Sequence, residues 1–426
     1  MAIFLQRLLY ALLLWLALPA IPLRLLVRGL KEPGYWRDIG ERFGGGAALA
    51  PHAVWIHAVS VGETRAAAPL VERFLAQGER VLLTCMTPAG RATAMQLFGN
   101  RVQLRYLPYD YAWAVRRFLR RARPARGIIM ETELWPNLVR ESVRTGVPLY
   151  LANARLSAKS AHGYRRIAAL TRASLQGFSA VAAQTEEDAQ RLRELGAAWV
   201  MVSGNLKFDV EPPQSQLELG ARFRARIGQR PAWLAASTRE GEEKLILQAF
   251  SREAPAEALL MLVPRHPQRF DEVAELARSL GLALQRRSED TPVSAATRVW
   301  LGDSLGEMFA YYAAADCAFV GGSLLPHGGQ NLIEACAVGC PVLVGPHTEN
   351  FKQVAAQAVA AGAAVRVDDA AEWLTHARDL AADAAARQRM GEHGRHFAEA
   401  HRGAAERIFR LVSVDHAGRN CQQGRT

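Results

Sequence analysis

The chain has 426 residues and a formal net charge of +11 at pH 7, and half of its residues are hydrophobic. This length and composition allow two or three domains with sizeable cores and exclude a largely disordered chain. The basic residues are scattered and no base-stacking aromatic motif accompanies them, so the charge favours an anionic substrate or an acidic membrane surface over nucleic acid.

An uncharged apolar segment runs from Leu8 to Leu23, and basic residues follow it at Arg24, Arg28, Lys31 and Arg37. The segment is slightly short of the roughly 20 residues that a membrane-spanning helix needs, and Pro19 and Pro22 would bend it. A marginal single span and a hairpin-like monotopic insertion both fit, whereas a cleaved signal peptide fits less well because only Arg7 precedes the segment. We expect residues 1–30 to be an uncleaved membrane anchor that keeps the rest of the chain on the cytoplasmic membrane face.

From residue 31 onward, short apolar runs alternate with longer amphipathic segments, a pattern typical of βαβ units around parallel sheets. The first half contains predicted strands at residues 54–58, 81–83, 102–107, 127–130, 148–151, 181–183 and 200–202. The second half repeats the rhythm at residues 233–235, 259–263, 282–284, 299–301, 318–320, 342–344 and 364–367. Between them, the paired prolines of Val210–Ser215 predict a linker, because proline cannot continue a helix or a central strand.

The simplest architecture is therefore α/β, with two similar domains at residues 31–210 and 211–413 and a polar tail at residues 414–426. Polar residues and glycines gather directly after the predicted strands. Open parallel sheets bind ligands at the carboxyl ends of their strands. We expect the site in a cleft where two such edges face each other.

Residues 320–347 carry the strongest indication of a ligand site. They predict a buried strand, a glycine-rich turn, a short helix that opens at Asn331, a second buried strand and a polar turn at Gly345–His347. A glycine-rich turn that runs into a helix presents backbone N–H groups and the positive end of the helix dipole to an anion. The segment therefore predicts a nucleotide site.

The first half holds three candidates for chemistry. Glu63 opens a predicted helix, where it is either half of a capping box with Ser60 or a general base that the helix dipole keeps ionised. Glu131 and Glu133 follow an apolar strand, where they either shape the start of the next helix or orient a base and stabilise charge. Lys207 is one of only five lysines among 52 basic residues, and it follows a glycine turn either by chance or for its compact ammonium group.

The second half holds candidates for nucleotide binding. Pro264 and Arg265 follow a predicted strand in a rigid turn suited to an anion, although ordinary turns have the same composition. Ser304–Glu307 and Asn331–Glu334 are helix openings whose glutamates either cap the helix or bind ribose hydroxyls.

Other features exclude or disfavour whole classes of site. The histidines lack metal-ligand spacing, so we expect no metal. The cysteines form neither a disulfide framework nor a zinc motif, and we expect small buried apolar side chains in a reducing compartment at Cys85, Cys317, Cys336, Cys340 and Cys421. The lack of GxGxxG after the first strand, and of GxSxG anywhere, disfavours dehydrogenases and α/β-hydrolases.

Several segments in the same order give the chain a close resemblance to the 3-deoxy-D-manno-octulosonic acid (Kdo) transferase family of lipopolysaccharide assembly. The resemblance extends from the N-terminal apolar segment to about residue 410, and its most specific segments are His57–Glu63, Met130–Asn137, Ala152–Ser157, Gly204–Asp209, Val263–Pro267 and Gly345–His347. Where the family commonly has Asn-Pro-Leu-Glu, this chain has leucine in place of the proline at residue 332, which affects only the rigidity of that helix start.

The resemblance implies a GT-B glycosyltransferase with two Rossmann-like domains, of which the first binds the acceptor and the second binds CMP-Kdo. It implies inverting, metal-independent transfer of Kdo to a tetraacylated lipid A precursor (lipid IVA) at the cell inner membrane, without a cofactor. The family's general base falls on Glu63, and its transition-state stabilising positions fall on Glu131 and Lys207. Its cytidine nucleotide contacts fall on Pro264, Arg265, Leu305, Gly306, Glu307, Asn331, Leu332, Ile333 and Glu334.

Two other functions remain compatible with the sequence. One is a UDP-sugar-dependent GT-B transferase that acts on another lipid acceptor, for which preferential binding of UDP over CMP would be the sign. The other is a membrane-tethered nucleotide-binding module without catalysis, which would form no product from CMP-Kdo and a lipid acceptor.

Overall fold

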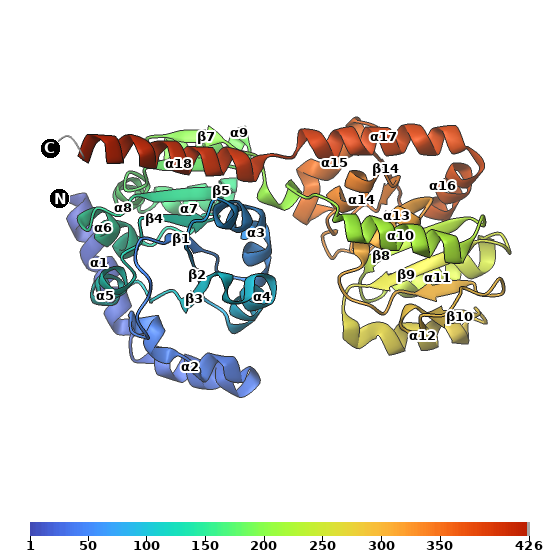
Figure 1. Ribbon diagram of the computed structural model, residues 1–426, viewed down its shortest axis with the longest axis horizontal. Helices are drawn as coiled ribbons and strands as arrows, with labels where there is room; N and C mark the ends of the chain where they lie inside the picture. The colour runs from blue at the N-terminus through green and yellow to red at the C-terminus, as the bar shows by residue number, and fades with distance from the viewer. Residues whose placement is uncertain (424–426) are drawn as a thin grey trace. The chain divides into compact units, whose positions relative to one another are not determined.

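The structure is a computed structural model that describes residues 1–423, with side chains described as far as Val414. The chain forms two compact units (Figure 1). The N-terminal unit comprises Met1–Asp209 and the residues from Arg402 onward, and the C-terminal unit comprises Val210–His401. The predicted division between residues 210 and 211 differs from the observed one by a single residue.

The N-terminal unit is built on a seven-stranded parallel sheet with the strand order β3-β2-β1-β4-β5-β6-β7. Val54 and Ile56 pack in the core on one face of this sheet, and Trp55 packs in the core on the other. Each predicted strand of the first half is confirmed, as β1 (Val54–His57), β2 (Val81–Cys85), β3 (Gln103–Tyr106), β4 (Arg126–Met130), β5 (Leu149–Ala154), β6 (Ala180–Ala183) and β7 (Val200–Val202).

Helices flank this sheet (Figure 1), and their bounds are α3 (Val61–Ala76), α4 (Pro88–Phe98), α5 (Ala112–Ala122), α6 (Pro136–Arg144), α7 (Ala158–Arg165), α8 (Ala168–Leu175), α9 (Glu186–Glu194) and α18 (Ala404–Gln423). The sequence assigns residues 402–413 to the second domain, but the structure places them in the N-terminal unit. The reason is the apolar stripe of α18, whose Ala404, Ile408 and Val412 complete the core beside α3. Helix α18 also continues through most of the predicted polar tail, and residues 424–426 lie outside the described part.

The C-terminal unit repeats this plan around a parallel sheet with the strand order β10-β11-β9-β8-β12-β13-β14. The strands are β8 (Ala232–Thr238), β9 (Leu259–Pro264), β10 (Leu284–Arg286), β11 (Val299–Leu301), β12 (Cys317–Val320), β13 (Val342–Val344) and β14 (Ala364–Arg366). Strand β10 begins two residues later than predicted. The N–H of Leu282 still donates to the carbonyl of Ala277 at the end of the preceding helix, so pairing with β11 begins only at Leu284.

The helices of the C-terminal unit are α10 (Gln214–Ile227), α11 (Glu242–Glu253), α12 (Phe270–Ser279), α13 (Met308–Ala314), α14 (Ile333–Val338), α15 (Lys352–Ala360), α16 (Ala370–Ala382) and α17 (Ala384–Ala400). Because Pro213 already caps α10, the extended linker is shorter than the predicted Val210–Ser215. The cysteines whose side chains are described are buried free thiols, as predicted, and Cys421 lies outside that set.

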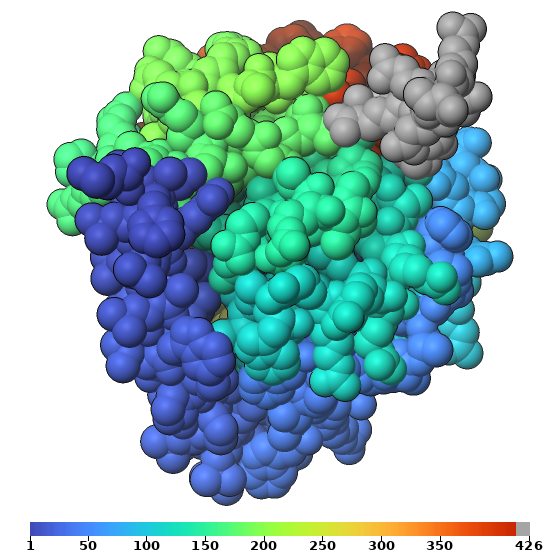
Figure 2. Space-filling view, turned by 90° about the vertical axis from the view of Figure 1, so that its left-hand side faces the viewer, coloured from blue at the N-terminus to red at the C-terminus, as the bar shows by residue number. Residues whose placement is uncertain are grey.

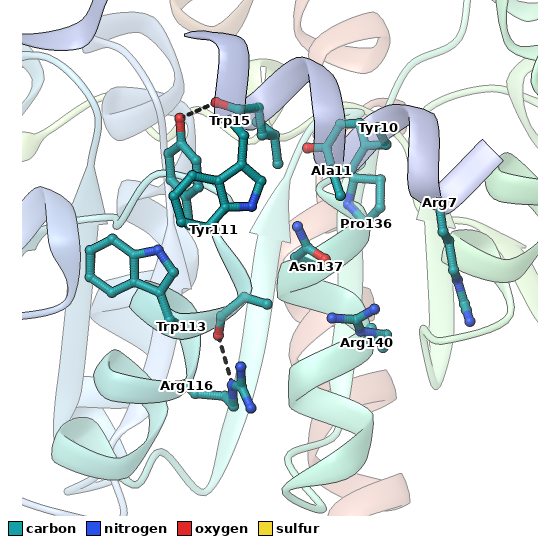
Figure 3. Close-up of a pocket in the computed structure, with 12 residues that line it drawn as sticks. Arg7, Tyr10, Ala11, Trp15, Tyr111, Trp113, Arg116, Pro136, Asn137 and Arg140 are labelled. Carbon is teal, nitrogen blue, oxygen red and sulfur yellow. Dashed lines mark hydrogen bonds between the residues drawn. The ribbon is translucent and has the colours of Figure 1, made fainter. Parts of the chain in front are cut away.

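The N-terminal apolar segment forms two helices, α1 (Ala2–Ala17) and α2 (Ala20–Lys31). Figure 3 shows how α1 lies against the unit: the Tyr111 hydroxyl donates to the Leu14 carbonyl at 2.6 Å, and the Trp15 ring meets the Tyr111 ring edge-on at 6.1 Å. No single helix in residues 1–423 has the length and apolar content to cross a membrane, whereas α1 and α2 meet those criteria as a pair bent by 52°. The membrane anchor therefore stays a prediction.

Candidate active site

The strand order of the N-terminal sheet reverses between β1 and β4, which are neighbours in space although two strands separate them in sequence. Open α/β sheets bind ligands in the crevice outside the carboxyl ends of the strands at such a reversal. Glu63 follows β1 and Glu131 follows β4. The fold thus brings two of the predicted catalytic residues to the position where a ligand is expected.

Glu63 lies in the first turn of α3 and takes part in its cap. The Ser60 hydroxyl accepts the N–H of Glu63 at 3.4 Å and donates to its carboxylate at 3.0 Å, while the carboxylate accepts the N–H of Val59 at 2.7 Å. The capping interpretation is therefore confirmed in the structure. A capping role is compatible with the second interpretation, because the Glu63 carboxylate is only half-buried.

The pKa of Glu63 is raised above its ordinary value. Burial is the largest cause, and the negative charge of Glu131 raises the pKa further. The N–H of Val59, the Ser60 hydroxyl and the ammonium group of Lys207 act in the opposite direction. A carboxylate with a raised pKa is a better proton acceptor near neutral pH, which is what a general base requires.

Glu131 is held in a strained backbone conformation. Its φ of 55° lies in the left-handed region, which costs a non-glycine residue about 1–3 kcal/mol. Its N–H donates to the carbonyl of Ala152 on β5 at 2.8 Å, which fixes the turn after β4. The side chain is directed to Lys207, whose Nζ lies 3.5 Å from Oε1 of Glu131. Both side chains are partly exposed, so this pair positions groups more than it stabilises the fold.

Lys207 lies on a short 3₁₀ helix (Leu206–Phe208) that follows β7. The side chain of Asn205 accepts the N–H of Lys207 at 2.9 Å, and the buried side chain of Asn153 accepts the N–H of Leu206 at 2.9 Å. Asn153 itself adopts a φ of 54° directly within the end of β5. From the sequence, Asn153 had no role beyond its place in the family segment Ala152–Ser157, and the structure identifies it as the residue that positions the Lys207 turn.

Glu133 is a third carboxyl group beside those of Glu63 and Glu131. Helix α6 begins at Pro136, so Glu133 lies in the loop ahead of it and does not start the helix. Burial, followed by the charges of Glu63 and Glu131, raises the pKa of Glu133 to about 7. The three carboxyl groups and Lys207 form one cluster, which we call the carboxyl cluster. The sequence already indicated Glu133, as the second glutamate of the Glu-Thr-Glu segment that follows an apolar strand.

The glycine-rich loop of the C-terminal unit follows β12, and a buried carboxylate organises it. Glu242 accepts the N–H groups of Gly322 at 2.6 Å, Leu324 at 2.8 Å and Arg239 at 2.8 Å. Gly321 lies so close to β8 that a Cβ would stand 2.6–2.8 Å from backbone atoms there, which leaves room only for glycine. Glu242 was missed in the sequence because two of its three partners, Gly322 and Leu324, lie 80 and 82 residues away.

Arg265 lies at the carboxyl end of β9, where its N–H donates to the carbonyl of Thr238 at 2.9 Å. Its side chain is exposed. The pKa of the adjacent His266 is lowered, first by burial and then by the charges of Arg239, Arg265 and Arg269. Arg239 and Arg265 therefore add positive charge at the ends of β8 and β9, and Arg239 adds to the residues predicted from the sequence. Arg269 lies beside them but is paired with Glu243 and Glu272, each at 3.2 Å.

The residues around Glu307 form a turn after β11. Leu305 is 74% exposed, and Gly306 has a φ of 80°. Glu307 immediately precedes α13, and its carboxylate accepts the Ser304 hydroxyl and, at 3.1 Å, Nη2 of Arg287. Because β11 and β9 are neighbours, this turn and Arg265 follow adjacent strands of one sheet edge.

The last predicted group, residues 331–334, follows β12 in the same sheet. Helix α14 begins at Ile333, so the prediction that it opens at Asn331 is wrong by two residues. The side chain of Asn331 instead accepts the N–H of Ile333 at 3.1 Å and shapes the approach to the helix. Leu332 and Ile333 have buried side chains, which limits their contact with a ligand to the backbone. Glu334 is only partly buried.

The described part of the chain contains no group of three or more His, Cys, Asp or Glu side chains placed to hold a metal ion.

Two family models match the chain in sequence. Residues 37–210 match the 3-Deoxy-D-manno-octulosonic-acid transferase (kdotransferase) family, and residues 282–397 match Glycosyl transferases group 1. The 3-deoxy-D-manno-octulosonic acid transferase of Bordetella pertussis is 46% identical over 92% of this chain and 95% of its own length. The enzyme of the same name from Haemophilus influenzae is 37% identical over 95% of this chain and 98% of its own length.

Solved structures share the fold at lower identity. A glycosyltransferase from Rickettsia africae superposes with a TM-score of 0.59 at 12% identity, over 85% of this chain and 99% of the other. The UDP-GlcNAc 2-epimerase of Neisseria meningitidis superposes with a TM-score of 0.57 at 15% identity, over 85% and 100%. These neighbours and the two parallel sheets confirm the prediction of two Rossmann-like domains in a glycosyltransferase fold. The sequence matches establish that the chain belongs to the 3-deoxy-D-manno-octulosonic acid transferase family and is a glycosyltransferase.

Proposed function

We propose that the protein transfers Kdo from CMP-Kdo to the phosphorylated, tetraacylated lipid A precursor lipid IVA, with inversion and without a metal ion. Kdo transfer is supported by the names of relatives that match almost the whole chain. The observation that carries the mechanism is the carboxyl cluster at the reversal point of the N-terminal sheet, where Glu63 has a raised pKa. We assign the acceptor to the N-terminal unit and CMP-Kdo to the C-terminal unit.

Glu63 acts as the general base in this proposal. It takes the proton from a sugar hydroxyl of the acceptor while that oxygen forms a bond to the anomeric carbon of Kdo. The bond from that carbon to the phosphate oxygen of CMP breaks, and CMP leaves with the bonding electron pair. One displacement of this kind inverts the anomeric centre. The Val59 and Ser60 hydrogen bonds hold the carboxylate in a fixed orientation for the proton transfer.

Lys207 and Glu131 stabilise charge in the transition state. Kdo carries a carboxylate, and the ammonium group of Lys207 is suited to bind it at close range. Glu131 lies 3.5 Å from Nζ and orients the ammonium group. The strained backbone at Glu131 is consistent with this role, because strain of that kind gathers at functional sites.

The positive charge that opposes CMP comes from side chains and backbone groups in this proposal. Arg265 follows β9 with an exposed guanidinium group, and Arg239 reinforces the local positive charge. The glycine-rich loop held by Glu242, together with Asn331 and Glu334, is assigned to the nucleotide. These groups balance the phosphate without requiring a cation.

We further propose that α1 and α2 hold the protein on the cytoplasmic face of the inner membrane. No side chain of helix α1 is fully buried, and its exposed apolar residues include Phe4, Leu5, Leu8, Leu9, Leu12, Leu13 and Leu16. Figure 2 shows the N-terminal segment, in dark blue, at the surface along one side of the view. Basic residues in and after α2 are suited to the anionic head groups of that leaflet.

Replacement of Glu63 by glutamine tests the mechanism. We expect kcat to fall by about 10²–10⁴, the usual contribution of a general base, while CMP binding is unchanged. Product formation from CMP-Kdo and lipid IVA is followed by mass spectrometry, and CMP binding by calorimetry. The matched control is Glu72→Gln, which alters an exposed glutamate of the same helix. Wild-type turnover in Glu63→Gln would refute the base assignment, and tighter binding of UDP than of CMP would refute the donor assignment.

A further inference from the structure

A cavity of about 480 Å³ lies between the N-terminal helices and the body of the N-terminal unit. Its volume is within the range of about 300–1,000 Å³ that is usual for ligand pockets. One wall is formed by apolar residues of α1 and α2, including Ile21 and Leu25. The opposite wall is formed by the loops after β1, β2 and β4, including Met86 and Trp135.

Arg42 lines this cavity and is the least satisfied charge in it. Its side chain is 1% exposed and lies between the rings of Tyr35 and Tyr106, at 5.6 and 3.9 Å from the ring centres. Nη1 donates to the Met86 carbonyl at 3.0 Å, whereas Nε and Nη2 have no hydrogen-bond partner among the described residues. Neighbouring Glu41 does not neutralise it, because the Glu41 carboxylate is engaged by Arg91 and Arg105 at 3.0 and 3.3 Å.

A buried guanidinium group without an acidic partner is costly, so its presence beside a cavity indicates an anion that binds there. Arg24 and Arg28 of α2 line the same cavity one helical turn apart, and neither is paired with a carboxylate within the described residues. Nη1 of Arg28 donates to the hydroxyl of Tyr35 at 3.2 Å. Of the two acids in the lining, Asp110 is already satisfied by the hydroxyl of Tyr10 and by N–H groups at the start of α6. The cavity therefore combines an apolar wall with an excess of positive charge.

The cavity also reaches the carboxyl cluster. Glu133 is part of its lining, and so is Val59, whose N–H binds the carboxylate of Glu63. A molecule that fills the cavity is therefore adjacent to the proposed base. This position favours the reacting lipid over a bulk phospholipid as the occupant.

We propose that this cavity is the acceptor subsite for one acyl chain and a neighbouring phosphate group of the lipid. The chain packs against Ile21, Leu25 and Met86, and the phosphate is bound by Arg24 and Arg28. Arg42 contributes buried positive charge from the cavity wall. The inference rests on the proposed function, since it names the part of the acceptor that the N-terminal unit binds. It assigns α2 a direct role in substrate recognition in addition to membrane contact.

The first test fills the cavity in the full-length protein. Leu25→Trp should raise the KM for lipid IVA at least tenfold and leave the KM for CMP-Kdo within twofold of the wild-type value. The control Leu26→Trp places the same side chain on the exposed face of α2 and should leave both values unchanged. An unchanged KM for lipid IVA in Leu25→Trp would overturn the proposal.

The second test removes charge at exposed positions, so that it does not depend on repacking the interior. The double variant Arg24→Ala/Arg28→Ala should raise the KM for lipid IVA about tenfold, with a smaller effect on a dephosphorylated acceptor. Arg37→Ala, a nearby exposed arginine outside the cavity, is the control. Equal effects on both acceptors would overturn the phosphate assignment.

Binding without turnover separates this proposal from the proposed function. Lipid IVA and phosphatidylglycerol vesicles are each titrated into Glu63→Gln protein with and without Leu25→Trp. The proposal requires that Leu25→Trp weakens lipid IVA binding at least tenfold and vesicle binding by less than twofold. Equal weakening of both would identify a site for bulk phospholipid and overturn the acceptor assignment. If the wild-type protein transfers Kdo while Leu25→Trp binds lipid IVA normally, only the cavity proposal fails.

Discussion

Replacing Glu242 by alanine tests whether one buried carboxylate holds the glycine-rich loop of the C-terminal unit in place. The carboxylate accepts the N–H groups of Arg239, Gly322 and Leu324, and the bonds to the last two are buried. A buried N–H without a partner costs about 1–3 kcal/mol, so the loss of two such bonds should destabilise the unit by roughly 2–6 kcal/mol. That is a large part of the roughly 5–15 kcal/mol by which a typical domain is stable.

Glutamine provides a graded comparison at the same position. Its single oxygen can take the place of Oε2, which accepts from Arg239 and Gly322, but its NH₂ group then meets the N–H of Leu324. One buried bond is lost, so we expect a cost of about 1–3 kcal/mol. Glu240→Ala alters an exposed glutamate in the same turn and should change stability by no more than about 0.5 kcal/mol.

The assay must report on the C-terminal unit separately, because a chain of two units does not unfold as a single two-state system. Amide hydrogen exchange read by mass spectrometry over residues 317–344, in a series of urea concentrations, gives the local stability of this segment. CMP binding, measured by calorimetry, should weaken in the order wild type, Glu242→Gln, Glu242→Ala. Wild-type protection and wild-type CMP affinity in Glu242→Ala would refute the reasoning.

Other perturbations test the remaining parts of the account. Lys207→Met should move the acidic limb of the kcat/KM pH profile to higher pH, because Lys207 lowers the pKa of Glu63. Glu131→Gln should move the same limb to lower pH, because Glu131 raises that pKa. Shifts in the opposite directions would contradict the role of Glu63 as the base. Burial lowers the pKa of His57 from 6.5 to about 4, so between these values the unfolded chain binds a proton that the folded chain does not. Stability should therefore fall by about 3 kcal/mol as the pH drops from 6.5 to 4, and His57→Asn should remove this dependence in denaturant unfolding. Gly321→Ala should destabilise the C-terminal unit by about 1–3 kcal/mol through overpacking, and an unchanged melting temperature would show that the loop has room.

Much of the fold was predictable from local patterns. The apolar runs and their intervening amphipathic segments located every strand of both sheets. Strand β10 begins two residues later than predicted, and β5 and β8 each end three residues later. The Ser60 cap was also visible, because a capping box depends on residues three positions apart. The paired prolines located the division between the units to within one residue, since proline restricts its own backbone.

The candidate site was predictable where its residues lie directly at strand ends. Glu63, Glu131 and Arg265 follow buried strands, and the order of the strands then brings the first two together. The opening of α14 was placed two residues early, because the cap at Asn331 depends on the loop conformation and not on composition alone.

The amino-acid sequence by itself determined the α/β class, the strands and the family resemblance, because these depend on periodicity and on motifs of a few neighbouring residues. The tertiary structure decided the features that depend on contacts between residues far apart in the sequence. In the folded chain, α18 packs in the core of the N-terminal unit, and Glu133 lies in the carboxyl cluster. Glu242 accepts hydrogen bonds from the glycine-rich loop. The tertiary structure also encloses Arg42 beside a cavity, where desolvation turns an ordinary arginine into the strongest indication of an anionic ligand.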